Sequence, residues 1–453
     1  GMDGLHPSVY LCSETQERFM WVCSPEITPL ILDHYNKVFD LPGVSEGARA
    51  SVVGKIRNDG RYIVHNGDEE IVNAKAKEVT EGFLYDRPFE AKESNFSEPN
   101  LPEPSNYNQI LLNILSHENM ASREPIFEQY DKQVQGRIHT ETGLADSGVM
   151  APFNSEKYPE EIRNVGIALS TDHNPRHGLI DPYWGGVNAV VESMRNVAAV
   201  GATPHALSDC LCFGNPEKPN QMWEFVEATR GVSDACNAIT LKDNPNDATP
   251  IIAGNVSFYN ESKKGAIPPS PIVSCLGRLK DVNKAVPMHF QKSNSVLLMI
   301  GERKNELGGS VYYSLFDELG ANVPKPNLEE VKNQIFALTD CIDDTLVLSC
   351  HDISDGGLAS ALAEMTFAKN IGCIIKIDSE LSMDKTLFSE TGGFVLEVSS
   401  ENLDEIKSVF SKYGLDVFKI GSTGGNTIKI NNALDLSVKK ANKAWTNGLR
   451  NKL

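Results

Sequence analysis

The chain has 453 residues, a formal net charge of −19, 40% apolar residues and 8% aromatic residues. This length exceeds what one hydrophobic core usually serves, so two or three domains are expected. The acidic balance argues against sequence-independent binding to nucleic acid or to an anionic membrane, since both need clustered lysine and arginine. No run approaches about 18 apolar residues and no leader pattern opens the chain, which predicts a cytoplasmic protein without membrane spans.

The first 90 residues predict a small α+β segment. Residues 9–24, VYLCSETQERFMWVCS, favour a mixed strand, and Ser24 followed by Pro25 favours a helix start. In RYIVHNGDEEIV, the Asn66-Gly67 pair between two extended runs predicts a hairpin. The segment is small for a domain, and we expect it to be the end of a unit whose beginning is missing.

A proline- and glutamate-rich stretch at 96–104 predicts an exposed linker. From residue 163 strands and helices alternate. NVGIALSTDHNPRHGLIDPYWGG predicts a strand followed by a polar loop, and the apolar spacing from Val187 to Ala198 predicts a helix that carries Arg195. Arg195 is expected to make an internal salt bridge or a phosphate contact. The pattern predicts an open α/β sheet with polar residues at its strand ends, where such sheets bind ligands.

The segment 249–262, TPIIAGNVSFYNES, combines a strand pattern with a polar end. Two isoleucines indicate a buried strand that Gly254 ends. A glycine lets the backbone approach a ligand, while the Asn255 amide and Ser257 hydroxyl suit a hard cation and a phosphate. The alternative is a strand followed by a polar turn. For Asp209, within ALSDCLCF, a capping or turn carboxylate is an equal alternative to a ligand role.

A further domain is expected from residue 275, with strands SVLLMIG, DTLVLSC, GCIIKI and GFVLEV and helices GGLASALAEMTFAK and ENLDEIKSVFSKY. The glycines of HDISDGG open a helix and could hold a phosphate through free N–H groups. For His351 and Asp352 a hydrogen-bonded pair is favoured over a ligand role.

The nine cysteines are scattered, and several lie in apolar runs, as reduced thiols do. Only Cys210 and Cys212 are close, and one C-x-C is weak evidence for zinc. The sequence contains no P-loop, no kinase glycine loop, no G-x-S-x-G and no H-E-x-x-H pattern.

Four strings together, STDHNPRHGLIDPYWGG, NVAAVGATPHALSDCLCFGNPEKP, GNVSFYNES and HDISDGGLASALAEM, resemble the phosphoribosylformylglycinamidine synthase large-subunit family. The broader family includes aminoimidazole ribonucleotide synthetase and selenophosphate synthetase. The resemblance covers essentially the whole chain and corresponds to the second half of that family. It implies a mixed α/β and α+β fold: residues 1–95 as the end of a first B-type domain, 96–104 as a linker, 105–274 as a half-barrel-forming A-type nucleotide-binding domain, and 275–453 as a B-type domain.

The resemblance also implies ligand contacts. Asp209 and Gly254 would contact ATP, Asn255 would bind Mg²⁺, and four residues would contact the substrate: Glu14, Thr15, Gln16 and Ser257. Thr15 departs from the serine usual in the family, and LFSETGGF at 387–394 is a second departure. No catalytic residue is assigned, because the family's catalytic histidines, ATP-binding lysine and most acidic metal ligands lie in its first half. His173 and His177 are therefore not assigned as a base.

The implied reaction is an ATP-dependent C–N ligation of purine biosynthesis that converts formylglycinamide ribonucleotide to its amidine. A separate glutaminase would supply ammonia, since no G-x-C-x-G motif occurs here, and a small bridging subunit is expected with it. The isolated chain would be an incomplete ligase that needs its missing half or a homodimer partner. One alternative is a separately encoded half. Another is a non-catalytic nucleotide-binding or scaffold subunit, and a kinase of the same fold is the weakest alternative.

Overall fold

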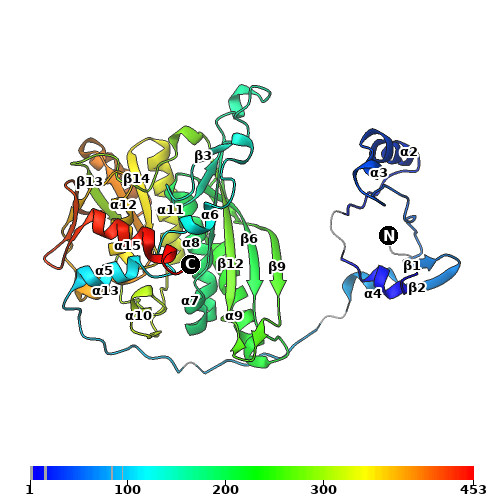
Figure 1. Cartoon of the computed structure of the whole chain (residues 1–453), viewed down its shortest axis with the longest axis horizontal. Helices are drawn as coiled ribbons and strands as arrows, with labels where there is room; N and C mark the ends of the chain where they lie inside the picture. Colours follow the sequence, from blue (N-terminus) through cyan, green and yellow to red (C-terminus); the bar gives the residue numbers. More distant parts are fainter. Residues whose placement is uncertain (1–3, 15–17, 83–84, 94) are drawn as a thin grey trace. The chain divides into compact units, whose positions relative to one another are not determined.

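A computed structural model describes residues 4–14, 18–82, 85–93 and 95–453. The chain divides into two compact units, residues 1–86 and residues 87–453 (Figure 1). None of the helices in the described ranges has the length and apolarity needed to cross a bilayer.

The first unit consists of short elements. These are α1 Pro7–Leu11, α2 Thr28–Asp33, a π-helical turn His34–Val38, α3 Leu41–Val44, β1 Arg61–Asn66, β2 Glu69–Lys75 and α4 Ala76–Glu81. The predicted hairpin is confirmed: β1 and β2 pair antiparallel, and Gly67 has φ +62. None of the residues described in this unit is buried. The unit therefore has no hydrophobic core of its own within the described residues.

Two local predictions for this unit were wrong. The expected strand at 9–24 begins as helix α1, and its described remainder is not extended into a strand. The expected helix start at Pro25 is a turn, and α2 begins at Thr28 with Pro29 near its N-terminus. The apolar side chains that suggested those elements have no core to enter: Phe19 is 87% exposed and Leu30 is 69% exposed. The spacing of apolar residues in the sequence does not show whether a core is present for them to enter.

The larger unit contains a six-stranded sheet in the order β3-β4-β5-β12-β6-β9. Its strands are β3 Ile138–Thr140, β4 Gly148–Met150, β5 Gly166–Asp172, β6 Thr203–Cys212, β9 Ile251–Ser257 and β12 Ser270–Leu279. All neighbouring pairs are antiparallel except β6 and β9, which are parallel. Two long helices, α8 Pro182–Ala199 and α9 Pro219–Ala238, pack against each other beside this sheet. Two short pairs, β7 Thr240–Leu241 with β8 Asn244–Ala248 and β10 Glu261–Ser262 with β11 Gly265–Ala266, form hairpins outside the main sheet.

A seven-stranded sheet follows in the order β14-β16-β13-β17-β15-β18-β19. Its strands are β13 Val296–Ile300, β14 Val347–Ile353, β15 Cys373–Ile375, β16 Gly393–Val398, β17 Phe418–Thr423, β18 Thr427–Ile430 and β19 Leu434–Ser437. The helices of this region are α10 Val311–Ser314, α11 Leu328–Asp343, α12 Gly357–Met365, α13 Met383–Phe388, α14 Leu403–Lys412 and α15 Val438–Arg450. The four strands and two helices expected from the sequence here are all present.

Both sheets share one hydrophobic core. It contains Val190 and Met194 of α8 together with Ile335 of α11 and Phe394 of β16, all buried. A second cluster lies on the other side of the seven-stranded sheet, where α5 Tyr107–Leu115 packs with α12 and α15. The short helices α6 Glu124–Phe127 and α7 Pro175–Ile180 complete the unit. Because one core serves both sheets, the two domains are held rigidly against each other.

Two expected boundaries can be located. The stretch expected as an exposed linker at 96–104 is fixed to the larger unit by Glu98, whose carboxylate accepts hydrogen bonds from the Tyr313 hydroxyl and the Ala321 and Asn322 amides at 2.6–2.8 Å. The boundary expected between 274 and 275 falls inside β12, which continues to Leu279 in the six-stranded sheet.

The contact between α8 and α9 depends on glycine. A Cβ added at Gly186 would overlap the Ala228 carbonyl oxygen, and one added at Gly231 would overlap the Tyr183 carbonyl oxygen. The two helix backbones therefore approach each other at a distance that a larger side chain does not allow.

We expect Gly186→Ala to destabilise the larger unit by about 1–3 kcal/mol, because the methyl group must separate the two helices. Urea unfolding followed by circular dichroism measures this. Gly148→Ala is the matched control, since a Cβ there would meet only the Leu169 carbonyl oxygen at 4.0 Å. Equal midpoints for the two variants would contradict the glycine contact.

Candidate functional site

The parallel pair β6 and β9 brings the predicted ATP and metal residues together. Its register sets Asp209 beside Gly254, Cys210 beside Asn255 and Cys212 beside Ser257. β9 is the last strand of its sheet. These residues, which lie more than 40 positions apart in the sequence, therefore form one edge of the larger unit.

The prediction of a buried strand ended by Gly254 was wrong in two respects. β9 runs through Gly254 to Ser257, and its apolar residues are exposed, with Ile252 at 68% and Val256 at 48%. The physical reason is its position at the edge of the sheet, where no helix covers it. An isoleucine pair indicates a strand but does not distinguish a central strand from an edge strand.

Gly254 has a steric role at this edge. A Cβ at this position would overlap the Asp209 carboxylate, so the carboxylate lies directly against the β9 backbone. Partial burial raises the pKa of Asp209, while the Asn255 N–H, which donates to this carboxylate, partly offsets that shift. The Asp209 carboxylate thus accepts a hydrogen bond from the Asn255 backbone N–H at the edge of the sheet.

The two faces of this edge differ. Side chains alternate along a strand, so Asp209 and Gly254 face the α9 side while Asn255 and Ser257 face the opposite side. On the α9 side Asp209 lines a cavity of about 280 Å³ together with Thr229 and Cys236. The Thr229 hydroxyl is buried without a hydrogen-bond partner. A ligand that contacts both Asp209 and Asn255 must therefore pass around the exposed edge of β9.

The loop after β9 is held by the predicted GNPEKP segment. The Asn260 amide donates to the carbonyl oxygens of Phe213 and Ser257 at 3.1 and 2.9 Å. Lys218 forms an ion pair with Glu261 at 2.6 Å, and the Tyr259 hydroxyl donates to Glu217 at 3.1 Å. The two loops thus form one polar rim beside Ser257.

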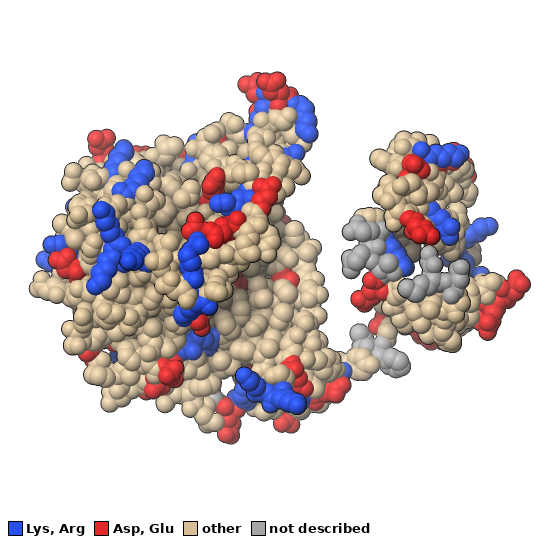
Figure 2. Space-filling model, in the orientation of Figure 1, with Lys and Arg blue, Asp and Glu red and all other residues tan. Residues whose placement is uncertain are grey.

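Few charged side chains and several exposed apolar ones lie around this edge. Figure 2 shows few charged side chains over β12, β6 and β9, in contrast to the charged groups elsewhere on the same face. Leu169, Ile251 and Val256 are each more than 40% exposed. Exposed apolar side chains at an unpaired sheet edge favour association with a partner.

Of the predicted substrate residues in the first unit, Glu14 is described and exposed. Thr15 and Gln16 lie outside the described residues. The structure therefore groups Asp209, Gly254, Asn255 and Ser257, and it describes Glu14 in a separate unit.

A second candidate site is a buried charged cluster where α8 meets β14. Arg195 lies 3.8 Å from Glu192 and 3.6 Å from Asp352, and its side chain is 5% exposed. Burial, followed by the negative charge of Asp146, raises the pKa of Asp352 to about 6 although Arg195 and His351 oppose the shift. Burial also raises the pKa of Asp172 to about 8. Of the two alternatives for Arg195, the structure shows the internal salt bridge.

His351 is bonded to Asp146 rather than to its neighbour Asp352. Its Nδ1 lies 2.7 Å from Asp146, its Nε2 lies 3.3 Å from Glu364, and Asp352 is 4.0 Å away. Although burial opposes it, the charge and hydrogen bond of Asp146 raise the pKa of His351 well above its usual value. Asp146, His351 and Asp352 could together offer ligand atoms to a metal ion. A histidine that retains its proton is a poor metal ligand, which favours the ion-pair interpretation.

The N–H groups of HDISDGG that could hold a phosphate are not free. The Gly356 N–H donates to the Glu390 carboxylate at 2.8 Å, and the Gly357 N–H donates to the Ser354 carbonyl at 2.9 Å. Glu390 also accepts from the Val311 N–H at 2.8 Å. The Glu390 carboxylate therefore accepts the Gly356 N–H hydrogen bond that a phosphate would have needed. Glu390 lies 34 residues away in the sequence, so no local pattern indicated it.

His177 is buried and His173 is half-buried in the loop and helix after β5. Burial lowers the pKa of His173 to about 4 and that of His177 to about 3, so both are neutral at pH 7. His177 Nε2 lies 3.9 Å from Glu390. His177 therefore lies beside Glu390.

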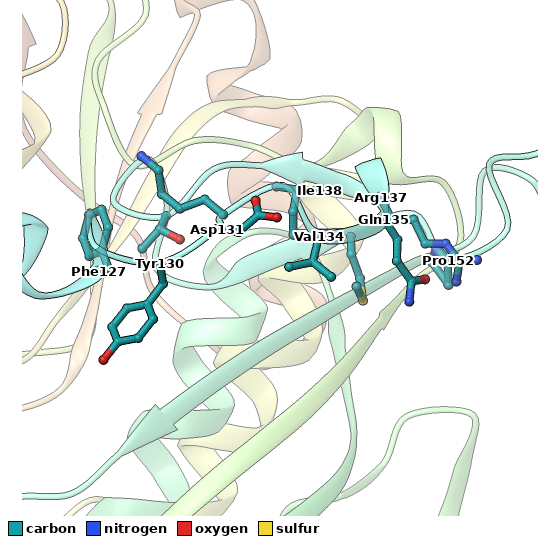
Figure 3. A pocket seen from close by; sticks show the side chains of 11 residues that line it. Phe127, Tyr130, Asp131, Val134, Gln135, Arg137, Ile138 and Pro152 are labelled. Atoms are coloured by element: carbon teal, nitrogen blue, oxygen red, sulfur yellow. The ribbon is translucent and has the colours of Figure 1, made fainter. Parts of the chain in front are cut away.

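A third feature is an open cavity of about 460 Å³ between the segment after α6 and β3 (Figure 3). Phe127, Val134 and Ile138 give it an apolar floor, and Lys132 and Arg137 stand among its lining residues. The sequence pattern gave no prediction for this cavity. No buried polar side chain or unpaired group of those described aims into it, so it has the features of a surface hollow.

The raised pKa of Asp352 predicts a pH dependence of stability. Because Asp352 holds its proton more tightly in the folded chain than at its ordinary pKa of 3.8, its contribution is full below about pH 4 and is lost as the pH rises through about 6. In Asp352→Asn this loss, at most about 3 kcal/mol, should be absent. Urea titrations between about pH 4 and 7 measure it, with the exposed Asp416→Asn as control. Parallel pH profiles for wild type and Asp352→Asn would refute the assignment.

Comparison with known families matches two parts of the chain. Residues 147–279 match the AIR synthase related protein N-terminal domain, and residues 292–430 match the AIR synthase related protein C-terminal domain. The first match covers the strands of the six-stranded sheet except β3. The second match covers the strands of the seven-stranded sheet except β19.

The chain is similar to curated proteins named phosphoribosylformylglycinamidine synthase subunit PurL. It is 42% identical over 462 residues to that of Methanothrix thermoacetophila, covering 99% of this chain and 59% of the relative. It is 35% identical over 440 residues to that of Methanocaldococcus jannaschii, covering 94% and 56%. The chain thus spans less than two thirds of the length of the relatives it matches.

Solved structures of Thermotoga maritima PurL share the fold. One complexed with ATP has a TM-score of 0.57 at 18% identity and covers 93% of this chain and 57% of that one. One complexed with FGAR has a TM-score of 0.58 at 17% identity and covers 75% and 54%. These likenesses confirm the expected fold class. With its two matched domains and its PurL relatives, the chain belongs to the AIR synthase related family.

Proposed function

We propose that this chain supplies the C-terminal part of a phosphoribosylformylglycinamidine synthase, an ATP-dependent ligase of purine biosynthesis in the cytoplasm. The observation that carries the proposal is the β6–β9 edge, where Gly254 leaves room for the Asp209 carboxylate and the register aligns Asn255 and Ser257. The names of the PurL relatives supply the substrate class.

In this proposal Asp209 and Gly254 contact ATP. The Asp209 carboxylate would accept hydrogen bonds from the nucleotide. The cavity of about 280 Å³ beside it could receive an apolar or aromatic group of the nucleotide. Asn255 would bind Mg²⁺ through its amide oxygen, since hard cations take oxygen ligands and Mg²⁺ needs few from protein when phosphates and water complete its shell. The Mg²⁺ would neutralise phosphate charge during phosphoryl transfer.

Ser257 would contact formylglycinamide ribonucleotide, as would Glu14, Thr15 and Gln16. Ser257 belongs to the polar rim formed by Asn260 and the GNPEKP loop, which restricts its position. The chain's residues thus bind and orient the substrates. The chemical step, attack of the formamide oxygen on the ATP γ-phosphate followed by displacement with ammonia, would use residues from outside this chain.

The partners follow from the same proposal. Ammonia would come from a glutaminase chain, with a small bridging subunit in the complex. One solved structure of the same fold is that of PurLQS from Thermotoga maritima, with a TM-score of 0.56 at 17% identity. The exposed apolar side chains of β9 support a further partner that covers them, either the missing half or a second copy.

A second candidate function is a non-catalytic nucleotide-binding or scaffold subunit. The observation that favours it is the buried cluster around Arg195 and Glu390, where Arg195 forms an ion pair with Asp352 and Glu390 accepts from the Gly356 N–H. Such a subunit would retain nucleotide without turnover, and Asp209→Ala would leave that retention unchanged.

The nucleotide site can be tested by calorimetric titration of Mg-ATP. If this chain holds nucleotide by itself, Asn255→Ala should weaken binding at least about tenfold, or about 1.4 kcal/mol. Asn426→Ala is the matched control, since Asn426 is exposed in the connection between β17 and β18 of the other sheet. Binding of equal strength in all three proteins would sink the Asn255 assignment.

Activity should require the rest of the synthase. We expect the chain alone to form no measurable amidine product from formylglycinamide ribonucleotide, Mg-ATP and ammonia, and to gain activity when a polypeptide carrying the missing half is added. A coupled assay of ADP release measures this. Turnover by the chain alone would contradict the proposal that the chemical step uses residues from outside this chain.

A further inference from the structure

Two thiols lie side by side on the open face of the six-stranded sheet. Cys210 and Cys212 are alternate residues of β6, so their side chains point to the same face, and their sulfur atoms are 3.7 Å apart. Both are partly exposed. The intervening Leu211 points to the opposite face and is 6% exposed. The two sulfurs are therefore in contact and within reach of a small reagent.

This pair differs from the other cysteines of the larger unit. Cys236, Cys275, Cys341, Cys350 and Cys373 are all buried. Burial raises the pKa of Cys236, Cys341 and Cys373 to about 12, which keeps those thiols protonated and unreactive. Of the thiols described in this unit, only Cys210 and Cys212 combine exposure with a neighbouring thiol.

The geometry permits a bond between the two sulfurs at the cost of strain. Alternate residues of a strand have Cα atoms roughly 6.6 Å apart, near the upper limit of about 6.8 Å for disulfides. Closing the sulfurs from 3.7 Å to the roughly 2.05 Å of a disulfide shortens β6 locally. Strained disulfides are more easily reduced, so such a bond would be absent in a reducing compartment and form under oxidation.

We propose that Cys210 and Cys212 form a reversible disulfide within β6 when the chain meets a small-molecule disulfide such as glutathione disulfide. Cys210 attacks one sulfur of the oxidant as the thiolate and releases one glutathione thiolate. Cys212 then loses its proton and attacks the Cys210 sulfur, which releases the second glutathione. The two protein sulfurs lose two electrons, the oxidant gains them, and the two protons end on the two glutathione thiols.

The position of Cys212 against Cys210 supports this order of steps. Burial and the contact with Cys210 raise the pKa of the Cys212 thiol, so Cys212 keeps its proton at neutral pH and serves as the resolving thiol. The reaction should therefore be slow at about pH 7 and faster at about pH 9, where more thiolate is present.

The bond would act on β9. Cys210 and Cys212 pair directly with Asn255 and Ser257, and within the described structure β6 is the only strand that pairs with β9. β6 is held on its other side by the longer pairing with β12. Shortening β6 should therefore loosen the β9 side first, which places a redox-sensitive element beside the β6–β9 edge.

Peptide mass spectrometry tests the bond on the full chain. In a Cys12→Ser/Cys23→Ser background, which removes the two exposed thiols of the first unit, we expect incubation with glutathione disulfide to yield a peptide with both cysteines two hydrogens lighter and closed to alkylation. Dithiothreitol should restore it. With Cys212→Ser added, a glutathione adduct should persist on Cys210. Two freely alkylated thiols, or only adducts in the dithiol protein, would overturn the proposal.

Hydrogen–deuterium exchange tests the effect on β9 without any nucleotide. The β9 amides should exchange roughly tenfold faster in the oxidised protein than in the reduced one. The Cys212→Ser variant should show no such change, which separates the disulfide from general oxidation. A disulfide that leaves β9 exchange unchanged would refute the coupling, whether or not the chain binds ATP.

Discussion

The arrangement of the larger unit depends on the close packing of α8 against α9, α11 and β14. Glycine at 186 and 231 lets α9 approach it, and the buried face of α8 contributes Val190 and Met194 to the core that both sheets share. Because α8 also contacts α11 and β14, it fixes the two sheets relative to each other. The same helix carries Arg195 into the buried cluster, so packing and electrostatics depend on one element.

Burial gives the charged cluster its properties. Removing carboxylates from water favours their protonated form, and one guanidinium cannot compensate several of them. Asp352 and Asp172 therefore titrate far above their ordinary range, while His173 and His177 remain neutral. Glu390 takes the amides at the start of α12, which closes the place where a phosphate was expected. This part of the protein is a buried charge network in which Arg195 Nε, Asp352 Oδ2 and Glu390 Oε2 have no hydrogen-bond partner. The proposed ligand site lies elsewhere.

The β6–β9 edge has the opposite character. It carries exposed apolar side chains beside its polar ones, and its backbone is paired on one side only. An edge strand with these properties is normally covered in the functional protein, because unpaired backbone groups and apolar surface favour association. The ligand residues, the thiol pair and the surface that favours a partner all share this edge. Binding, oxidation and assembly would therefore act on the same strand.

The sequence by itself determined the elements with strong local signals: the Asn66-Gly67 hairpin, the α8 helix and the second sheet follow from turn chemistry and apolar spacing. The motif strings also indicated the family, which the comparisons confirmed. Only the tertiary structure decided which distant residues meet, as in the bond of His351 to Asp146 and the contact of Glu390 with Gly356. The exposure of β9 likewise depends on what packs nearby. The local sequence pattern indicates the helix or strand propensity of a segment. Burial and long-range pairing depend on the folded chain as a whole.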